Sequence, residues 1–179
     1  RIDTENGPVA VETLEIGDRV LTRDNGLQPV RWVGRRRFDA SLLRLRRRLA
    51  PIRIEAGALG NRAALTVSPE HRMLITGDPA EILFAEREVL VPAKSLVNGD
   101  TITRTVPEEG IEYVHIMFDR HELVRSEGTW SESFNPAATA LASMTAASTR
   151  ELLESFPELA GGQVLPQTRP VIGQAPLPH

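Results

Sequence analysis

The sequence has 179 residues, of which 41% are hydrophobic, so it is long enough to bury one substantial core. Its net charge of −3 gives no overall attraction to nucleic acid or to an acidic membrane surface, and it contains no cysteine. Disulfides, thiolate metal sites and a cysteine nucleophile are therefore excluded within this chain. The apolar runs are too short to span a bilayer, and no signal-peptide pattern opens the sequence. Secreted and cytoplasmic locations both stay open, and a monomer without nucleic-acid or membrane partners is expected.

The first three quarters of the chain alternate short β-like runs with turn signals. Asn25-Gly26 between two such runs is a strong hairpin signal, because both residues tolerate a positive φ. Many short strands at this spacing favour an all-β fold over a βαβ fold. The expected strands cover residues 9–11, 20–22, 30–33, 51–54, 65–67, 73–76, 89–91, 102–103, 112–118 and 123–124.

One short pattern occurs twice. Leu14-Glu-Ile-Gly17-Asp18-Arg-Val20 returns as Leu96-Val-Asn-Gly99-Asp100-Thr-Ile102, each time after a valine-rich run. The pattern predicts an apolar anchor, a turn in which Gly takes a left-handed conformation and Asp caps it, and then a new strand. Coincidence between two ordinary turns is the alternative. We favour a duplicated β-subdomain with approximate twofold symmetry.

The composition changes after Pro136. Ser148-Thr-Arg-Glu151 has the form of a capping box, and the apolar residues after it predict a short amphipathic helix that ends before Pro157. The Ala-rich run 137–147 is a second helical candidate. Gly161-Gly162 and several prolines predict an extended tail. The expected organisation is a β domain over 1–135, a helical extension over 136–160 and a tail over 161–179.

Arginines crowd into residues 31–53, where Asp39 is the only acid. A nucleic-acid surface is one interpretation, and a solvated hairpin or loop in an arginine-rich protein is the other. We favour the second, because no aromatic stacking pattern accompanies the charge.

Three of the four histidines interrupt β-like runs. His71 follows the turn Ser68-Pro-Glu, and His115 and His121 flank the bend at Asp119. A histidine held at the start of a strand can give a proton to a peptide nitrogen or polarise a carbonyl, and Ser68 can bond the same backbone group. From the residues alone, a capped turn with a packed histidine is the stronger interpretation.

Several motifs together resemble the Hint domains of hedgehog proteins and inteins. Ser68-Pro-Glu-His71 resembles the Thr-x-x-His block of that family, and residues 113–128 resemble its later block with an acidic bend and a histidine. A bacterial subfamily is most similar, through Ser-Pro-x-His-Arg, Asp-Arg-His-Glu and Glu127-Gly-Thr-Trp-Ser131-Glu132-Ser133. The resemblance covers about residues 1–135 and implies a horseshoe of two pseudo-twofold β-subdomains, with a short C-terminal helix.

The resemblance also implies a self-processing activity without a cofactor or a metal. In this family a cysteine attacks the preceding carbonyl and converts a peptide bond into a thioester, so the substrate is the protein's own upstream segment. His71 would protonate the leaving nitrogen, Ser68 would hold the twisted peptide and His121 would help to resolve the thioester. We expect the imidazoles of His71 and His121 to face the strand at the start of the chain.

Three departures from the family limit this transfer. Related sequences open with a Cys-Phe-x-x-Gly-Thr segment, and this sequence starts just after that point. Splicing inteins carry an Asp where Val114 and His115 stand; His115 either substitutes for it or is a plain strand histidine, and Asp119 lies farther along. The His-Asn end of inteins is replaced by Glu132-Ser133, which favours N-terminal cleavage over splicing.

Two other functional hypotheses stay open. A Hint scaffold without activity would present loops or its helical tail to a partner, and a parent protein without an upstream cysteine would favour it. A metal-dependent hydrolase that uses His71, His115, His121 and Glu122 would need three ligands converging on one point. We rank the hydrolase last.

Overall fold

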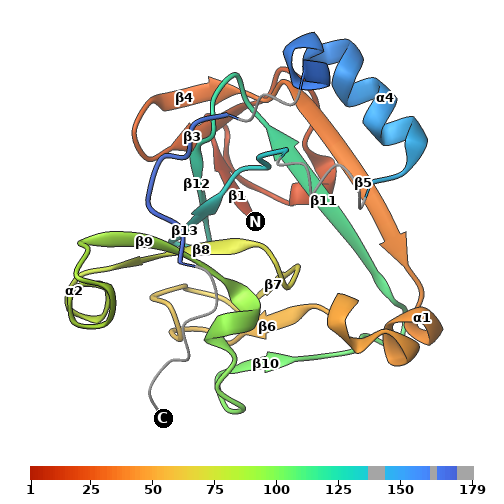
Figure 1. Ribbon diagram of the computed structural model, residues 1–179. Helices are drawn as coiled ribbons and strands as arrows, with labels where there is room; N and C mark the ends of the chain where they lie inside the picture. Colours follow the sequence, from red (N-terminus) through yellow and green to blue (C-terminus); the bar gives the residue numbers. More distant parts are fainter. Residues whose placement is uncertain (137–143, 162–164, 173–179) are drawn as a thin grey trace. The chain divides into compact units, whose positions relative to one another are not determined.

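The structure, a computed structural model, describes residues 1–136, 144–161 and 165–172. These residues form mostly antiparallel strands with a few short helices, which confirms the expected all-β class (Figure 1). The chain forms two compact units, and each unit takes its residues from three separate stretches. Unit 1 holds the described residues of 1–36, 114–124 and 133–168, and unit 2 holds those of 37–113, 125–132 and 169–172.

Unit 1 is built on a small antiparallel sheet. In it β3 pairs with β1 at Thr4 and Val20, with β12 at Thr22 and Val124, and with β4 along its whole length. The hairpin prediction is confirmed, but the turn between β3 and β4 consists of residues 23–25. Gly26 already belongs to β4 and pairs with Thr22, and it has the expected positive φ, 64°, whereas Asn25 does not. The strands are β1 (Ile2–Thr4), β2 (Gly7–Val9), β3 (Arg19–Thr22), β4 (Gly26–Pro29) and β12 (Leu123–Ser126), whose last two residues belong to unit 2.

A helix covers part of unit 1. Helix α4 (Ala146–Ser155) packs Leu152 against Trp32 and Met117, and these three side chains are almost completely buried. A helix of this length is only marginally stable in water by itself, so the burial of these large apolar side chains stabilises it. The helical prediction is confirmed, although the helix begins at Ala146 with Thr145 as N-cap, rather than at Ser148. The rest of the Ala-rich candidate, residues 137–143, lies outside the described residues.

Unit 2 contains a three-stranded antiparallel sheet, three strands that belong to the eight-stranded sheet, and a core that both share. The first runs in the order β10–β6–β7, and in the second β8 pairs with β9 and with β13. Their buried residues form one cluster that includes Ile52, Ile54, Met73 and Val91. The strands are β6 (Ile52–Ile54), β7 (Leu65–Val67), β8 (Arg72–Thr76), β9 (Glu88–Pro92), β10 (Ile102–Arg104) and β13 (Thr129–Glu132).

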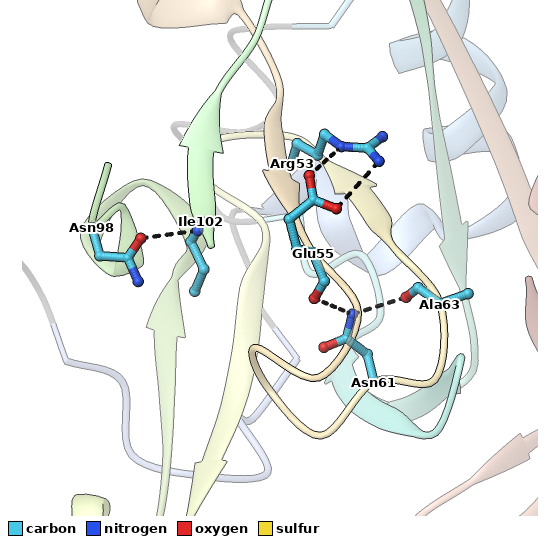
Figure 2. Close-up of polar contacts among 6 residues, drawn as sticks. All are labelled: Arg53, Glu55, Asn61, Ala63, Asn98 and Ile102. Carbon is cyan, nitrogen blue, oxygen red and sulfur yellow. Dashed lines mark hydrogen bonds and ion pairs between the residues drawn. The ribbon is translucent and has the colours of Figure 1, made fainter. Parts of the chain in front are cut away.

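The loop between β6 and β7 is fixed by one buried asparagine. The side-chain amide of Asn61 donates to the carbonyls of Glu55 and Ala63, at 2.9 and 2.8 Å (Figure 2). The side-chain oxygen of Asn61 accepts from the N–H of Leu59. Arg53 and Glu55 form an exposed ion pair above this loop. A polar group that is 3% exposed needs such complete pairing, so Asn61 determines the path of the loop.

Two long strands carry the chain between the units. Strands β5 (Trp32–Phe38) and β11 (Ile111–Met117) pair with each other, and the unit boundary falls within both of them. Arg35, Arg36 and Arg37 lie in β5, and Arg46, Arg47 and Arg48 lie in the turn after helix α1 (Ala40–Leu45). The first arginine run is therefore a strand rather than a hairpin loop. Helices α1 and α2 (Asp78–Phe84) were not predicted; Asp39 caps α1 by accepting from the N–H of Leu42 at 2.7 Å.

The repeated turn has the same local structure in both units. In each case a strand (β2 or β9) leads into a short 3₁₀ helix, η1 (Val11–Thr13) or η3 (Ala93–Leu96), and then into the turn and a new strand. Gly17 and Gly99 both take the predicted left-handed conformation, with φ of 97° and 78°. Asp18 caps the first turn by accepting from the N–H of Glu15. In the second turn the cap is Asn98 instead of Asp100, because its side-chain oxygen accepts from the N–H of Asp100. The same oxygen accepts from the N–H of Ile102 (Figure 2).

The start of the predicted tail is attached to unit 2. The N–H of Leu90 donates to the carbonyl of Pro170, and the N–H of Ile172 donates to the carbonyl of Leu90, so this segment adds a parallel bridge to the edge of β9. Arg169 and Glu88 form a part-buried ion pair beside it. Composition does not explain this attachment, which depends on β pairing with the edge of β9.

Candidate active site

Ser68 and His71 form one tight turn in unit 2. The N–H of His71 donates to the carbonyl of Ser68 at 3.1 Å, and Pro69 between them restricts φ at the first turn position. The N–H groups of Ala93 and Lys94 then donate to the carbonyls of His71 and Pro69, both at 2.9 Å. The turn is therefore fixed at both ends. The hydroxyl of Ser68 has no hydrogen-bond partner within the part of the chain that the structure describes.

The environment of His71 favours a neutral imidazole. The ring is half-buried, and its desolvation lowers the pKa of His71 below the ordinary 6.5, while the negative charge of Glu132 acts in the opposite direction. Glu132 itself is held by Arg72, whose guanidinium lies 3.2 Å from one carboxylate oxygen and whose N–H donates to the other. Burial is the larger influence, so His71 is mainly unprotonated at neutral pH and is a stronger acid when protonated.

His121 lies in unit 1 and is buried, with 1% of its surface exposed. Its Nδ1 accepts from the backbone N–H of Thr168 at 3.3 Å, which places the ring hydrogen on Nε2. The tautomer of this histidine is therefore set by a residue 47 positions away along the chain.

Next to His121, Glu122 is also buried, with 2% of its surface exposed. Its two carboxylate oxygens accept from the side-chain amide of Asn25, at 2.9 and 3.0 Å. Its backbone N–H donates to the hydroxyl of Ser133, and its carbonyl accepts from the N–H of the same residue. The bend that carries His121 and Glu122 is thus held by side chains from β-hairpin and strand ends far apart in the sequence.

The other two predicted site residues of unit 1 lie in different surroundings. His115, on β11, packs its ring against Phe134, with ring centroids 5.0 Å apart. Asp119 is exposed at the bend, and its carboxylate lies 3.2 Å from the guanidinium of Arg31. His115 therefore has the contacts of a packed strand histidine, whereas Asp119 belongs to the surface beside His121.

The register of the unit 1 sheet places the beginning of the chain at the same end as His121 and Glu122. Thr4 pairs with Val20 in the antiparallel sense, so the chain upstream of Thr4 runs in the direction in which β3 leads from Val20 toward Arg23. The other edge of β3 is taken by β4, so β12 lies on the same edge as β1, where Val124 pairs with Thr22 and the N–H of Arg23 donates to the carbonyl of Leu123. The bend at His121 and Glu122 therefore follows directly beyond Arg23, where the β3–β4 turn begins.

The predicted site residues fall into two groups. Ser68 and His71 belong to unit 2, and His115, Asp119 and His121 belong to unit 1. Among the described residues, no group of three or more His, Cys, Asp or Glu side chains could hold a metal ion, so the three converging ligands of the hydrolase hypothesis are not found. The described helices also include none with the length and apolar character needed to cross a membrane.

Four residues that contact the site residues or their neighbours were not predicted to have this role. Glu132 and Ser133 occur in a motif that carried the family resemblance, but only as a replacement for His-Asn. Asn25 was predicted as a turn residue and not as a carboxylate partner. Thr168 gave no signal, because its contribution is a backbone N–H that every residue except proline possesses.

Comparison with known proteins places the chain in a family. The model of the Hint domain family matches residues 1–138, and the chain therefore belongs to the Hint domain family. No curated protein matches the chain. Two solved structures are similar to it. A GSH-linked, splice-inactive variant of the AceL NrdHF class 3 split intein is 17% identical, with a TM-score of 0.49 over 74% of this chain and 92% of that one. The MchDnaB-1 intein is 11% identical, with a TM-score of 0.45 over 73% and 93%.

Proposed function

We propose that this chain is the self-processing part of a larger protein and cleaves the peptide bond before a cysteine that precedes Arg1 in that protein. Membership of the Hint family supports this class of activity. The single observation that carries the proposal in this chain is the sheet register. A segment that continues β1 upstream of Arg1 runs toward the β3–β4 turn and the bend with His121 and Glu122.

The first step is an N-to-S acyl shift. The neutral imidazole of His71 takes the proton of the cysteine thiol, and the thiolate attacks the preceding carbonyl carbon. The carbon–sulfur bond forms as the carbon–nitrogen bond breaks, and the imidazolium gives its proton to the leaving nitrogen. A lowered pKa suits His71 to both transfers, because the neutral ring is abundant and its protonated form is a strong donor. The hydroxyl of Ser68 holds the carbonyl of the twisted peptide.

His121 acts in the second step, the resolution of the thioester. Its Nε2–H can donate to the thioester carbonyl, because Nδ1 is occupied by the N–H of Thr168. We propose N-terminal cleavage rather than splicing, because Glu132 and Ser133 take the place of the His-Asn pair, and both are engaged in holding Arg72 and Glu122. Neither side chain can cyclise as an asparagine does.

The test uses the chain preceded by a short tag and a cysteine-led segment of the family type. Incubation with dithiothreitol should release the tag at the cysteine, as read by mass spectrometry. His71→Ala should slow the release about 100-fold or more, because a positioned acid–base group contributes about 10²–10⁴-fold. The matched control is His179→Ala, which removes the same side chain at the last residue.

Two results would count against this proposal. If the tag is not released from the unmodified fusion, the chain is a scaffold without activity. If it is released equally fast by the His71→Ala variant, the acid–base assignment is wrong and His121 becomes the candidate for the first step.

A further inference from the structure

A polar pocket opens in unit 1 beside the bend that carries His121. Its volume is about 360 Å³, and it is lined by Asn25, Gln28, Asp119, Arg120 and Glu122. Pockets for small ligands have volumes of about 300–1,000 Å³, so this one suits a small polar group on a short chain. All of its lining residues come from the β3–β4 hairpin and the adjacent bend, and neither element is assigned to the first step above.

The lining includes a buried carboxylate without a cationic partner. Glu122 is 2% exposed, and within the described part of the chain its carboxylate is hydrogen-bonded by the amide of Asn25 alone and forms no ion pair. A buried charge is costly unless an opposite charge or several hydrogen bonds compensate it. The amide donates one hydrogen bond to each oxygen, so acceptor capacity remains at both oxygens on a wall of the pocket.

The remaining lining residues favour an organic cation over a metal ion. Asp119 adds a second carboxylate at the exposed rim, and the Nε2 of Gln28 donates to the carbonyl of Asn25 at 2.6 Å, which leaves its side-chain oxygen as a further acceptor. A primary ammonium has three donors and a single charge, which matches these acceptors. The guanidinium of Arg120 also lines the pocket, and its positive charge opposes a divalent ion more than a monovalent one.

We propose that this pocket binds the ammonium group of an alkylamine, such as a lysine side chain, with Glu122 as the main counter-charge. The inference rests on the proposed function, in which it identifies the acceptor that resolves the thioester. The bound ammonium gives one proton to water as it leaves Glu122, and the neutral amine attacks the thioester carbonyl. The carbon–nitrogen bond forms, the carbon–sulfur bond breaks, and a second proton passes from nitrogen to the cysteine sulfur.

Binding is measured on the chain as it stands, without an upstream cysteine. Butylammonium chloride and 1-butanol are titrated separately at neutral pH, and the side-chain amide signals of Asn25 are followed by NMR. We expect saturable shifts with butylammonium and none with butanol, because only the ammonium pairs with Glu122. Glu122→Gln should weaken binding by tenfold or more, since charge-assisted hydrogen bonds are the stronger ones. Glu12→Gln, which neutralises an exposed acid on η1 of the same unit, should leave binding unchanged.

A second variant keeps the test decisive if Glu122→Gln does not fold. Arg120 is exposed, so Arg120→Gln should fold and should tighten butylammonium binding about threefold, because a like charge is removed at solvent-screened distance. The proposal is overturned if butylammonium gives no saturable shift, if butanol binds as tightly, if calcium chloride displaces the amine at equal concentration, or if Arg120→Gln weakens binding. Failure here leaves the cleavage proposal intact, since cleavage is read on the cysteine-led fusion. If the fusion does not cleave, the pocket can still bind an amine, but it has no role as the acceptor site of a thioester.

Discussion

The two histidine sites are held in different ways. The Ser68–His71 turn of unit 2 closes through a hydrogen bond between residues three positions apart, and its other supports are the backbone N–H groups of Ala93 and Lys94 at the start of η3. The bend with His121 and Glu122 in unit 1 depends on side chains and backbone groups 11, 47 and 97 positions away, from Ser133, Thr168 and Asn25. A local motif determines the first site, whereas the tertiary fold of unit 1 determines the second.

This difference has a chemical counterpart. His71 is half-buried in a turn, and the carboxylate of Glu132 influences its protonation. His121 is almost completely enclosed, and the hydrogen bond from Thr168 determines which of its nitrogens carries the proton. The environment of His71 suits a ring that must take up and release a proton. The environment of His121 suits a ring that donates one fixed hydrogen bond. The roles proposed for the two histidines follow from these environments.

The largest expected difference between the two histidine sites is the effect of a serine-to-alanine substitution on stability. Ser133→Ala removes the hydroxyl that accepts from the buried N–H of Glu122, and leaving that donor unsatisfied should lower the free energy of unfolding by about 1–3 kcal/mol. Ser68→Ala should change it by less than about 0.5 kcal/mol, because no described residue bonds its hydroxyl. Urea unfolding measures both. Equal losses for the two variants would show that the bend does not depend on its distant partners.

The pH dependence of stability tests the environment of His71 in unit 2. Since burial lowers the pKa of His71 in the folded chain, the unfolded chain takes up a proton at this residue first when the pH falls through 6.5. The contribution of His71 to the free energy of unfolding is therefore complete above 6.5 and decreases as the pH falls toward the folded pKa. His71→Gln should make the loss of stability between about pH 7.5 and pH 5.5 smaller than in the unmodified chain. A loss that is unchanged or larger in the variant would contradict the direction of the shift.

The sequence predicted the local features of the fold and missed the distant ones. The Asn25-Gly26 hairpin and the left-handed glycines of the repeated turn were correct, because each depends on backbone preferences of one or two residues. Helix α1 was missed, since its signal lies in one capping residue, Asp39, amid a run of arginines that suggested only charge. The pairing of residues 170–172 with β9 depends on an open strand edge, which composition does not reveal.

The start of helix α4 shows how two valid signals compete. Ser148 and Glu151 have the spacing of a capping box, yet the N-cap is Thr145, whose hydroxyl accepts from the N–H of Ser148. Both residues can cap, and the earlier start extends the helix by one turn. Of the site residues, Ser68 and His71 were identified as one turn from their spacing alone. The buried pair of Asn25 and Glu122 had no such signal, because residues 97 positions apart meet only in the folded unit.

Trapping of the thioester with hydroxylamine tests the central claim most directly. The cysteine-led fusion is incubated with neutral hydroxylamine without added thiol, and the upstream fragment is weighed by mass spectrometry. A thioester formed at the cysteine predicts a fragment that ends in a hydroxamate, because hydroxylamine attacks thioesters far faster than peptide bonds. A fusion that stays intact, or a fragment cut at any other position, would contradict the account.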